Sequence, residues 1–377
     1  MRILVVNAGS SSLKLRVLDP HDRLVAAADL PPPRDPSTLD ALRGAVAGFG
    51  AVDAVGHRVV HGGTRFAGPV RVDAAVEREL RALGDLAPLH QAPSLHALDA
   101  TRAVLPDVPA VACFDTAFHA TIPPPAATYA LPAQWRQRWP LRRFGFHGLS
   151  HAAAARRVAA LLHRPLETLR IVTCHLGAGA SLCAVHGGRS VDTTMGFTPL
   201  DGLVMATRSG SVDPGLLLWL EEHAGMAPAD LADALEHRSG LSGLAGEADM
   251  AVLLRRYGQG DPEAALAVDV YVHRLRGAVA AMAAAMGGLD ALAFTGGVGE
   301  HAPTIRALTA DGLGFLGVEL DERRNAEAIP AAPGTSDVDG TAPDAWAIGA
   351  EGAPVATAVV TAREDLEIAA QVRRLLG

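Results

Sequence analysis

Residues 3–18 read ILVVNAGSSSLKLRVL, two apolar runs on either side of a Gly-Ser turn. Aliphatic and β-branched runs bounded by such a turn predict two strands, at 3–7 and 13–19, paired as a hairpin. The pattern returns at 170–186 as RIVTCHLGAGASLCAVH, with Gly177 in the place of Gly9. Strands are predicted there at 170–175 and 182–186. One strand–turn–strand unit in each half predicts two related domains.

Outward from these hairpins, strand and helix patterns alternate along the chain. Short apolar runs predict further strands at 24–28, 51–60, 108–113, 289–295 and 355–361. Helices are predicted from about residue 150, over 261–286 and over 364–376, the second with Asp261 as its cap and Pro262 in its first turn. Val72, Val76, Leu80 and Leu83 also have helical spacing. The segments 31–36, 119–146 and 331–345 are predicted as loops or connections. This alternation indicates an α/β fold.

Composition limits the classes of protein that fit. The chain of 377 residues is long enough for two ordinary domains. Hydrophobic residues make up 49% and charged residues 20%, which excludes wholesale disorder. The net charge of −8 and the lack of a basic run argue against a nucleic-acid partner. The longest apolar run, 278–289, is well short of the roughly 20 residues of a membrane span.

The expected compartment follows from the N-terminus and the cysteines. The first apolar run turns polar at Asn7, too early for a signal peptide. The three cysteines form no C-x-x-C pair and leave an odd one over, which suits a reducing compartment. We therefore expect a cytoplasmic protein without a membrane partner.

Lysine use singles out one position. Of the 33 lysine and arginine residues only Lys14 is a lysine, and it ends the first glycine-rich motif. A compact ammonium binds phosphate as a point charge, and arginine is not a simple replacement for it. Chance retention of one lysine is the alternative, but the position favours a phosphate contact.

Three glycine-rich turns are candidate anion sites. The turn at 7–12 exposes backbone N–H groups and hydroxyls that can bind a phosphate, although an ordinary hairpin turn would look the same. It is not a P-loop, because G-x-x-x-x-G-K-[ST] is absent and a strand follows. The turn at 175–181 is a weak signal alone. The third, TGGVGE at 295–300, lies between a predicted strand and a helix, where N–H groups point at a ligand or simply form a tight connection.

An arginine and two histidines occur together in GHRVVHGG at 56–63. His57 and His61 are four residues apart, the spacing of a helical zinc site. The Val-Val and Gly-Gly neighbours oppose a helix, so we reject zinc. A surface strand end remains the alternative to a site containing Arg58.

Further candidates follow later in the chain. Asp115 comes after a buried strand and is either a helix cap, the default reading, or a site residue. His147 lies in a glycine-rich approach, with His151 four residues on. Ser150 is a candidate cap for the next helix, which would make His151 structural. Arg208, in TRSG, is well placed to present its guanidinium to an anion.

Seven segments together resemble the acetate kinase family, within the sugar kinase, Hsp70 and actin superfamily. In the family's order they are NAGSSSLK (7–14), GHRVVHGG (56–63), FDTAFH (114–119), RRFGFHGLSH (142–151), CHLGAGAS (174–181), VDTTMGFTPLDGLVMATRSG (191–210) and FTGGVGE (294–300). The resemblance implies two related domains of the ribonuclease H-like, actin-like ATPase type with the active site in the cleft between them. It assigns 1–117, with a C-terminal helix at about 363–377, to an acyl and phosphate domain, and 118–362 to a nucleotide-binding domain.

The resemblance also implies an activity and its residues. The activity is direct in-line transfer of phosphate between ATP and acetate, giving ADP and acetyl phosphate, with Mg²⁺ (or Mn²⁺), by a homodimer. The matching catalytic residues are Arg58, Asp115, His147 and Arg208. The matching acyl pocket consists of Arg58, Val60, Leu89, Phe146 and Pro199. The metal contacts are Asn7 and, in a stretch with one extra residue, Glu364. The nucleotide contacts are Lys14, His175, Leu176, Gly177, Ala178, Gly179, Asp249, Gly296, Gly297, Val298, Gly299 and Glu300.

Three positions depart from the family's pattern. Ala178 stands where asparagine is usual in a phosphate loop, Ala251 where arginine is usual near the adenosine site, and Ser211 where aspartate usually follows the substrate arginine. The first two leave the phosphoryl donor open. Val60 fills space that propionate-preferring relatives leave with alanine, which favours acetate. One methylene is worth only about 1–3 kcal/mol, so propionate should still react.

Other functions stay open. A propionate or butyrate kinase of the same fold would differ only in acyl preference. A non-catalytic, Hsp70-like nucleotide-binding protein would bind ATP without forming an acyl phosphate. The joint presence of Arg58, Asp115, His147 and Arg208 argues against it. A metalloprotein built on the paired histidines is a third possibility.

Overall fold

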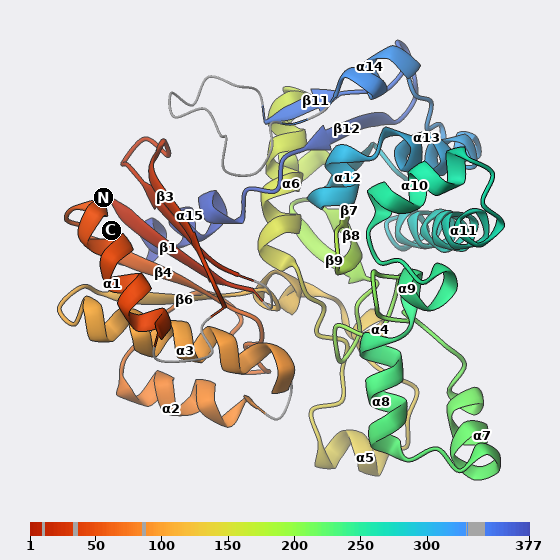
Figure 1. Cartoon of the computed structure of the whole chain (residues 1–377). Helices are drawn as coiled ribbons and strands as arrows, with labels where there is room; N and C mark the ends of the chain where they lie inside the picture. The colour runs from red at the N-terminus through yellow and green to blue at the C-terminus, as the bar shows by residue number, and fades with distance from the viewer. Residues whose placement is uncertain (10–11, 33–36, 85–87, 329, 331–343) are drawn as a thin grey trace.

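Two six-stranded sheets, one in each half of the chain, form the framework of the computed structural model (Figure 1). The structure describes all residues except 10–11, 33–36, 85–87, 329 and 331–343, and describes 37–39 and 88–90 without their side chains. The first sheet contains β1 (Ile3–Ala8), β2 (Leu13–Leu18), β3 (Leu24–Leu30), β4 (Ala54–Val59), β5 (Val70–Arg71) and β6 (Ala110–Phe114). The second contains β7 (Arg170–Leu176), β8 (Ala180–His186), β9 (Arg189–Thr193), β10 (Ala291–Thr295), β11 (Ala345–Ala347) and β12 (Ala356–Val360).

The two sheets have the same topology. In the first, β1, β2 and β3 form an antiparallel meander, β1, β4 and β6 run parallel, and β5 is antiparallel to β6 at the edge. In the second, β7, β8 and β9 repeat the meander, β7, β10 and β12 run parallel, and β11 is antiparallel to β12. This duplication confirms the predicted α/β fold of two related ribonuclease H-like domains.

Helices cover both faces of the first sheet. Successive side chains of a strand point to opposite faces. In β1, Leu4 and Val6 therefore pack in a cluster with α1 (Ser37–Phe49) and α3 (Pro88–Val104), and Ile3 and Val5 pack with α15 (Glu364–Leu376). A strand buried on both faces reads as a continuous apolar run, which explains the sequence of residues 3–6. The short α2 (Ala74–Ala82) lies beyond α3 (Figure 1).

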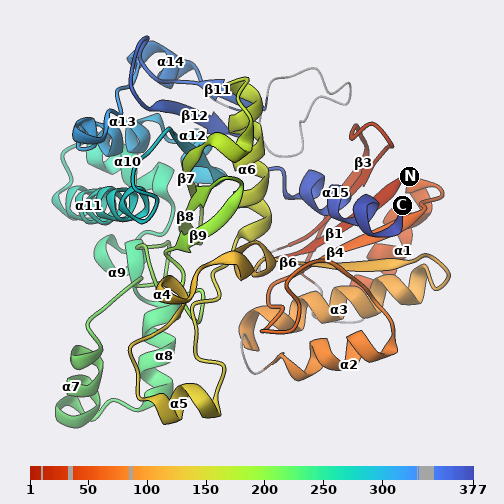
Figure 2. The same ribbon diagram turned by 180° about the vertical axis from the view of Figure 1, so that it is seen from behind.

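Two helices cross between the halves. The helix α6 (Gly148–Leu161) comes after β6 of the first sheet but packs on β7 and β10 of the second. The helix α15 follows β12 of the second sheet but packs on β1 and β4 of the first, and it also contacts α6 (Figure 2). The packing is close: a Cβ on Gly56 of β4 would lie 2.5 Å from Ile368 of α15, so only glycine fits there.

The second half carries a large helical insertion between β9 and β10. It contains α7 (Pro214–Ala224), α8 (Pro228–His237), α9 (Gly240–Ala245), α10 (Met250–Gly258) and α11 (Pro262–Ala285). As predicted, Asp261 caps α11 by accepting from the N–H groups of Glu263 and Ala264. After β10 come α12 (Gly296–His301), α13 (Pro303–Asp311) and α14 (Glu322–Glu327).

The remaining predicted elements have mixed outcomes. Every predicted strand is present, with its ends shifted by a few residues. The connection at 119–146 holds only short helices, among them α4 (Pro124–Ala127) and α5 (Ala133–Arg138). Most of the predicted loop at 331–345 lies outside the described residues. Among the described helices, none has the length and hydrophobicity to cross a membrane.

Candidate active site

A cleft of about 230 Å³ lies where the carboxyl ends of the parallel strands of both sheets meet. From the first half it is lined by Asn7, Gly9, Ser12, Lys14, Arg58, Val60 and Asp115, and from the second by Phe146, His147, Gly179, Pro199 and Arg208. The four residues predicted as catalytic therefore line one cleft, together with four of the five predicted acyl-pocket residues, Arg58 being in both sets. Carboxyl ends of strands are the usual ligand-binding edge of open α/β sheets.

On the side of the cleft formed by the first half, an ion pair joins the ends of two neighbouring strands, β4 and β6. Arg58 of β4 donates from Nε and Nη2 to the two carboxylate oxygens of Asp115, at 3.2 and 2.5 Å. Burial raises the pKa of Asp115 to about 6 against the opposing effect of Arg58, and Glu364 adds to the rise. Burial lowers the pKa of Arg58, but the carboxylates of Asp115 and Glu364 outweigh it, so the net shift is upward. At pH 7 the pair is ionised, with a fixed bidentate geometry.

Asp115 is not a helix cap, so that default prediction was wrong. Its side chain is only 1% exposed and pairs with Arg58, and its backbone oxygen accepts from the N–H of Gly148 at 2.9 Å. A Cβ on Gly148 would lie 2.2 Å from that oxygen, so glycine is required where α6 starts.

Asn7 and Glu364 meet beside this ion pair although they lie at opposite ends of the chain. The Nδ2 of Asn7 donates to Oε2 of Glu364 at 2.8 Å, and Arg58 Nη1 donates to Oδ1 of Asn7 at 3.4 Å. Arg58 Nε also lies 3.9 Å from Glu364 Oε2. The crossing of α15 onto the first sheet is what brings Glu364 to this place, because it is the first residue of that helix.

His147 enters the cleft from the second half. It caps α6 with a left-handed backbone, φ 57°, which is uncommon outside glycine and marks a constrained position. Its Nδ1 lies 2.8 Å from Ser181 Oγ, and its ring stacks on His175 at 4.3 Å. Burial lowers the pKa of His147 well below its ordinary value, and the nearby His175 ring acts in the same direction, so the free ring is neutral at pH 7.

The predicted cap of α6 was wrong. His147, not Ser150, occupies the cap position, and Ser150 Oγ instead lies 2.8 Å from Nδ1 of His175. Our reading of His151 as a structural residue fits its environment: its ring is fully buried between Thr173 and Ser181.

Arg208 lies in the cleft wall with a partner that the sequence did not indicate. Its Nε is 3.2 Å from a carboxylate oxygen of Glu236 in α8, and its Nη1 donates to the backbone oxygen of Pro199 at 3.4 Å. Burial lowers the pKa of Arg208, with Glu236 opposing, but guanidinium groups stay protonated in proteins. Glu236 stands far from Arg208 in sequence and in no recognisable motif, so no sequence signal could have identified it.

The predicted nucleotide turns lie beside the cleft. Gly179 lines it, and Gly177 lies against the third turn, since a Cβ on Gly177 would be 4.0 Å from the nitrogen of Gly297. That predicted turn consists of Thr295 and the first residues of α12, where the N–H of Gly296 donates to Oε1 of Glu300 at 2.9 Å. The same oxygen accepts from the N–H of Ala362, so Glu300 joins the turn to the chain that leads into α15.

Several predicted residues are placed elsewhere or differently. Asp249 caps α10, accepting from the N–H groups of Ala251 and Val252, and does not line the cleft. Leu89 lies in α3 among residues whose side chains are outside the described part. The paired His57 and His61 form no metal site: the described residues contain no cluster of three or more His, Cys, Asp or Glu suited to a metal.

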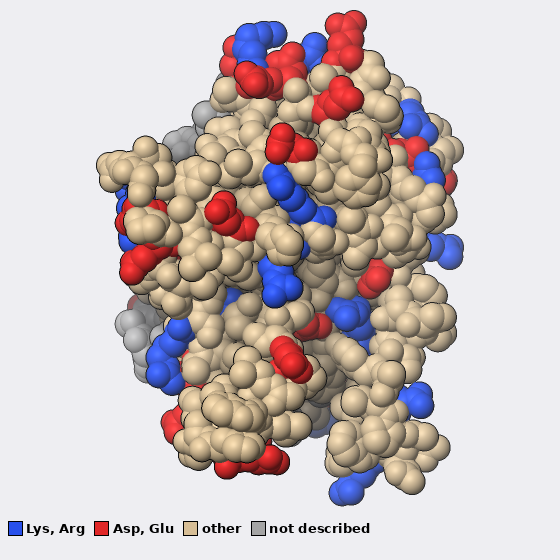
Figure 3. Space-filling model, turned by 90° about the vertical axis from the view of Figure 1, so that its right-hand side faces the viewer, with Lys and Arg blue, Asp and Glu red and all other residues tan. Residues whose placement is uncertain are grey.

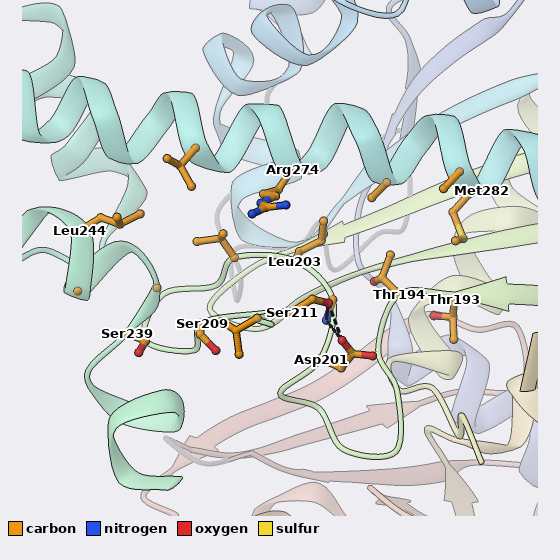
Figure 4. Close-up of a pocket in the computed structure, with 18 of the residues that line it drawn as sticks. Thr193, Thr194, Asp201, Leu203, Ser209, Ser211, Ser239, Leu244, Arg274 and Met282 are labelled. Carbon is orange, nitrogen blue, oxygen red and sulfur yellow. Dashed lines mark hydrogen bonds between the residues drawn. The ribbon is translucent and has the colours of Figure 1, made fainter. Parts of the chain in front are cut away.

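A second cavity, of about 660 Å³, is larger and contains the ion pair of Arg143 with Asp201, but all the residues that line it belong to the second half. It lies beside α11 and the loop that carries Arg208 (Figure 4). Ser211, one of the departures from the family's pattern, donates to Asp201 at 2.5 Å across its edge. We assign the chemistry to the smaller cleft, because only there do cationic groups from both halves meet a buried carboxylate.

Comparisons with known proteins agree with the resemblance seen in the sequence. The acetokinase family profile matches residues 41–370. The acetate kinase of Leifsonia xyli subsp. xyli is 45% identical, over 98% of this chain and 97% of that protein. The acetate kinase of Deinococcus deserti is 43% identical, over 100% and 98%.

Solved structures are similar over the full length. The acetate kinase of Porphyromonas gingivalis superposes with a TM-score of 0.88 at 32% identity, covering 100% of both chains. A propionate kinase from Francisella tularensis subsp. tularensis superposes with a TM-score of 0.86 at 31% identity, covering 98% of each chain.

Proposed function

The chain belongs to the acetokinase family, and from that premise we propose that its cleft transfers a phosphoryl group reversibly between ATP and acetate. The products are ADP and acetyl phosphate, so the enzyme is a phosphotransferase with a carboxyl group as acceptor. The observation that carries the proposal is the meeting of Arg58 and Arg208, from different halves, with Asp115 and His147 in one cleft.

The acceptor needs no general base. A carboxylic acid with a pKa near 4 is already ionised at pH 7 and is nucleophilic as it stands. Asp115 is therefore a positioning residue: it holds the Arg58 guanidinium through two hydrogen bonds. The main barrier is the approach of one anion to another, with charge spread over the oxygens of the transferring group.

Preorganised positive charge lowers that barrier. Arg58 and Lys14 supply it from the first half and Arg208 from the second, with His147 as a further hydrogen-bond donor. Fixed charges in a desolvated cleft are usually the largest catalytic contribution. Because the acetate oxygen attacks the phosphorus directly, we propose in-line transfer without a phosphorylated enzyme.

The residues present fit Mg²⁺, with Mn²⁺ as a possible substitute. Asn7 and Glu364 lie side by side and carry an amide oxygen and a carboxylate, and Asp115 is close by. Hard oxygen ligands, few in number, are what Mg²⁺ takes when phosphates and water complete its shell. Asn7 and Glu364 would hold the ion, which would neutralise phosphate charge. In the structure these two side chains are hydrogen bonded to each other.

Acetate is the favoured acyl substrate. Val60 and Phe146, 4% and 2% exposed, close the cleft beside Arg58 together with Pro199. A propionate kinase activity is the second candidate, favoured by the similar Francisella tularensis structure. A single methylene gives about 10–200-fold discrimination at most, so the two candidate activities differ only in the relative kcat/KM for acetate and propionate.

We propose that the two domains, 1–117 with 363–377 and 118–362, close on their ligands. Lys14 and Arg58 lie on one side of the cleft, and Gly179 and the turn at 296–300 belong to the other. Closure would exclude water and limit ATP hydrolysis. Scattering curves that are the same with and without acetate, ADP and a phosphate analogue would contradict it.

A homodimer is the proposed assembly. Leu216, Leu218 and Trp219 of α7 are 48%, 57% and 53% exposed, and α7 has no buried residue. The face that carries α7 and α11 has broad areas without charged side chains (Figure 3). A second copy covering it would remove apolar surface from water. The three free, buried cysteines are compatible with the cytoplasmic setting that we propose.

One assay matrix tests the function. ATP, GTP and pyrophosphate are each combined with acetate, propionate and butyrate, and acyl phosphate is trapped as the hydroxamate. We expect the highest kcat/KM for ATP with acetate. Nucleotide binding without any hydroxamate would refute the proposal in favour of a non-catalytic ATP-binding protein. Chiral phosphate analysis should show inversion, whereas retention would implicate a phosphorylated enzyme.

A further inference from the structure

We infer that Thr173, Ser181 and His151 are positioning residues that fix the tautomer of His147, so that its Nε2–H faces the cleft. None of the three lines the cleft. The inference rests on the proposed function, because it assigns the role of His147 toward a transferring phosphoryl group.

The four side chains form a continuous row that runs from the half-buried His147 at the cleft to three buried residues. His147 Nδ1 lies 2.8 Å from Ser181 Oγ, and the same oxygen lies 2.9 Å from Nε2 of His151. Nδ1 of His151 lies 2.8 Å from Thr173 Oγ1. Thr173, Ser181 and His151 are all 0% exposed. No water can replace a missing partner, so each donor must meet an acceptor within the row.

The row is built by one helix and two strands. His147 and His151 are one turn apart in α6, so their rings point to the same side. They reach Ser181 of β8 from either side, and Thr173 lies on the adjacent β7. Their neighbours in the layer between α6 and the second sheet, such as Ala155, Ile171 and Val185, are apolar. The spacing of four that suggests a metal pair thus serves to place two rings on one hydroxyl.

The number of available protons couples the tautomer of His151 to the tautomer of His147. Ser181 has one hydroxyl proton and lies between two imidazole nitrogens, so it donates to one and accepts from the other. Burial lowers the pKa of both His147 and His151 well below the ordinary value, so each ring is neutral with one N–H. The tautomer of His151 therefore dictates that of His147.

The hydroxyl of Thr173 determines which way the hydrogen bonds of the row point. Its hydroxyl proton has two possible acceptors, Nδ1 of His151 at 2.8 Å and the backbone oxygen of Cys183 at 3.5 Å. The shorter contact is a normal hydrogen bond and the longer one is at the limit. With Thr173 donating, His151 accepts at Nδ1 and donates from Nε2 to Ser181. Ser181 then donates to Nδ1 of His147, and the proton of that ring is on Nε2.

The ring nitrogen of His147 that faces the cleft, Nε2, is where a hydrogen-bond donor is needed. A Cβ on Gly179 would lie 3.4 Å from both His147 Nε2 and Arg208 Nη1, so these groups converge at the turn. Both can donate to a phosphoryl oxygen between them. The other tautomer would present a lone pair to that anion. The charged groups that line the cleft with His147 are Lys14, Arg58, Asp115 and Arg208, and the ring of His175 stacks on it.

His119 provides a reference inside the same protein. Its Nε2 lies 2.9 Å from the backbone oxygen of Phe146, which can only accept, so His119 must have its proton on Nε2. Its Nδ1 lies 2.8 Å from Ser190 Oγ. Ser190 with His119 is thus a second buried serine–histidine pair, with neither residue lining the cleft.

The direct test is ¹⁵N NMR of the full chain with labelled histidine ring nitrogens. Signals are assigned by loss in His147→Gln, His151→Gln and His119→Gln. We expect His147 and His151 to match His119, with Nε2 protonated and Nδ1 not. A proton on Nδ1 of His147 overturns the inference. Because the measurement needs no turnover, it decides the inference even if the hydroxamate assay refutes the proposed function.

Kinetics give a second readout. Ser181→Ala should lower kcat by about 10²-fold, as for loss of one transition-state donor, with the KM values for acetate and ATP little changed. The matched Ser190→Ala should leave kcat close to wild type. Thr173→Val should lower kcat and Thr173→Ser should restore it. If Ser181→Ala and Ser190→Ala reduce kcat equally, or if Thr173→Val matches wild type, the effect is not positioning and the inference fails.

Discussion

The first and second sheets each meet the cleft with a hairpin turn, and equivalent positions of the two hairpins carry different side chains. Asn7 pairs in register with Lys14 across β1 and β2, and His175 pairs with Ser181 across β7 and β8. The adjacent parallel strand ends with Arg58 and Val59 in the first sheet and with Thr295 in the second. One scaffold therefore presents ionic groups on one side and neutral donors on the other.

The two helices that cross between the halves, α15 and α6, show the same contrast between ionic and neutral groups. Each starts at the cleft, and each begins with a polar side chain laid on the other half's sheet: Glu364 at the start of α15 and His147 at the cap of α6. Glu364 joins Asn7 and Arg58, whereas His147 joins Ser181 and His175. Under the proposed function, the charge that would meet the phosphoryl group and the metal is therefore concentrated in the first half. The second half contributes mainly uncharged donors and backbone turns, with Arg208 as its cation in the cleft.

Removing the arginine of the first half should have the largest effect. Arg58→Ala deletes a fixed charge at the reacting groups and leaves Asp115 buried without its partner, so kcat should fall by about 10²–10³-fold or more. Hydroxamate formation at saturating substrates measures it. Arg16→Ala is the control, since Arg16 pairs with Asp29 in the same sheet. Comparable losses in both variants would mean that the effect is on folding and not on charge at the cleft.

Removing the charge of Asp115, the carboxylate partner of Arg58, should lower kcat somewhat less than Arg58→Ala does. Asp115→Asn keeps the shape but frees Arg58 from its bidentate contact, and misplacement of a catalytic group by about 1 Å can cost about 10²-fold in rate. We expect kcat to fall and the Mg²⁺ dependence to shift. Any fall in rate of the parent enzyme near pH 6 should disappear in the variant, because only the ionised carboxylate of Asp115 holds Arg58. If kcat falls while the Mg²⁺ dependence is unchanged, the positioning role is wrong.

Making the first hairpin resemble the second should weaken nucleotide binding. Lys14→Ser removes the single lysine at the position that matches Ser181, and a hydrogen bond to a charged group is worth about 1.5–3 kcal/mol. The KM for ATP should therefore rise by about 10-fold or more, with a smaller change in the KM for acetate. An equal rise in both would place Lys14 at the acyl end instead.

The smallest expected effect is a lower KM for ATP, produced by a substitution in the second half. Ala178 is exposed in the turn at 177–179, so Ala178→Asn should fit and restore a side-chain amide near the phosphates. One added hydrogen bond of about 0.5–1.5 kcal/mol lowers the KM for ATP by about 2–10-fold. The kcat with ATP should stay near wild type. An unchanged KM for ATP would show that the turn already binds through its backbone alone.

Local patterns predicted most of the fold because strands buried on both faces leave an unmistakable signal. Residues 3–6 and 171–174 read as continuous runs, and the duplicated turns marked their pairing. The crossing of α6 left no such signal, and the return of α15 to the first domain was implied only by the family resemblance. A helix of suitable amphipathicity fits either sheet, and only the complementary surface, such as Gly56 under Ile368, decides which.

The site was predictable where a motif carries the chemistry and not where tertiary contact does. Arg58 and His147 lie in glycine-rich stretches that reveal them, and Asp115 is marked by its place directly after a buried strand in FDTAFH. Glu236 reaches Arg208 from a helix with an ordinary sequence, and nothing local marks it. The errors at Asp115 and Ser150 share one cause: a polar residue after a strand or before a helix is most often a cap, and here tertiary partners outcompete the helix end.

The exchanged helices also determine whether the molecule can be divided. Cut after residue 117, the N-terminal piece would lack α15 and expose Ile3, Val5 and Val111 to water. The C-terminal piece would keep the contact between α15 and α6 but would leave Ile368 and Val372 without the first sheet. Neither fragment should fold alone, and mixing the two should reconstitute activity by complementation. We also expect heat or denaturant to unfold both halves in one cooperative step instead of two, because each half loses part of its core when the other unfolds.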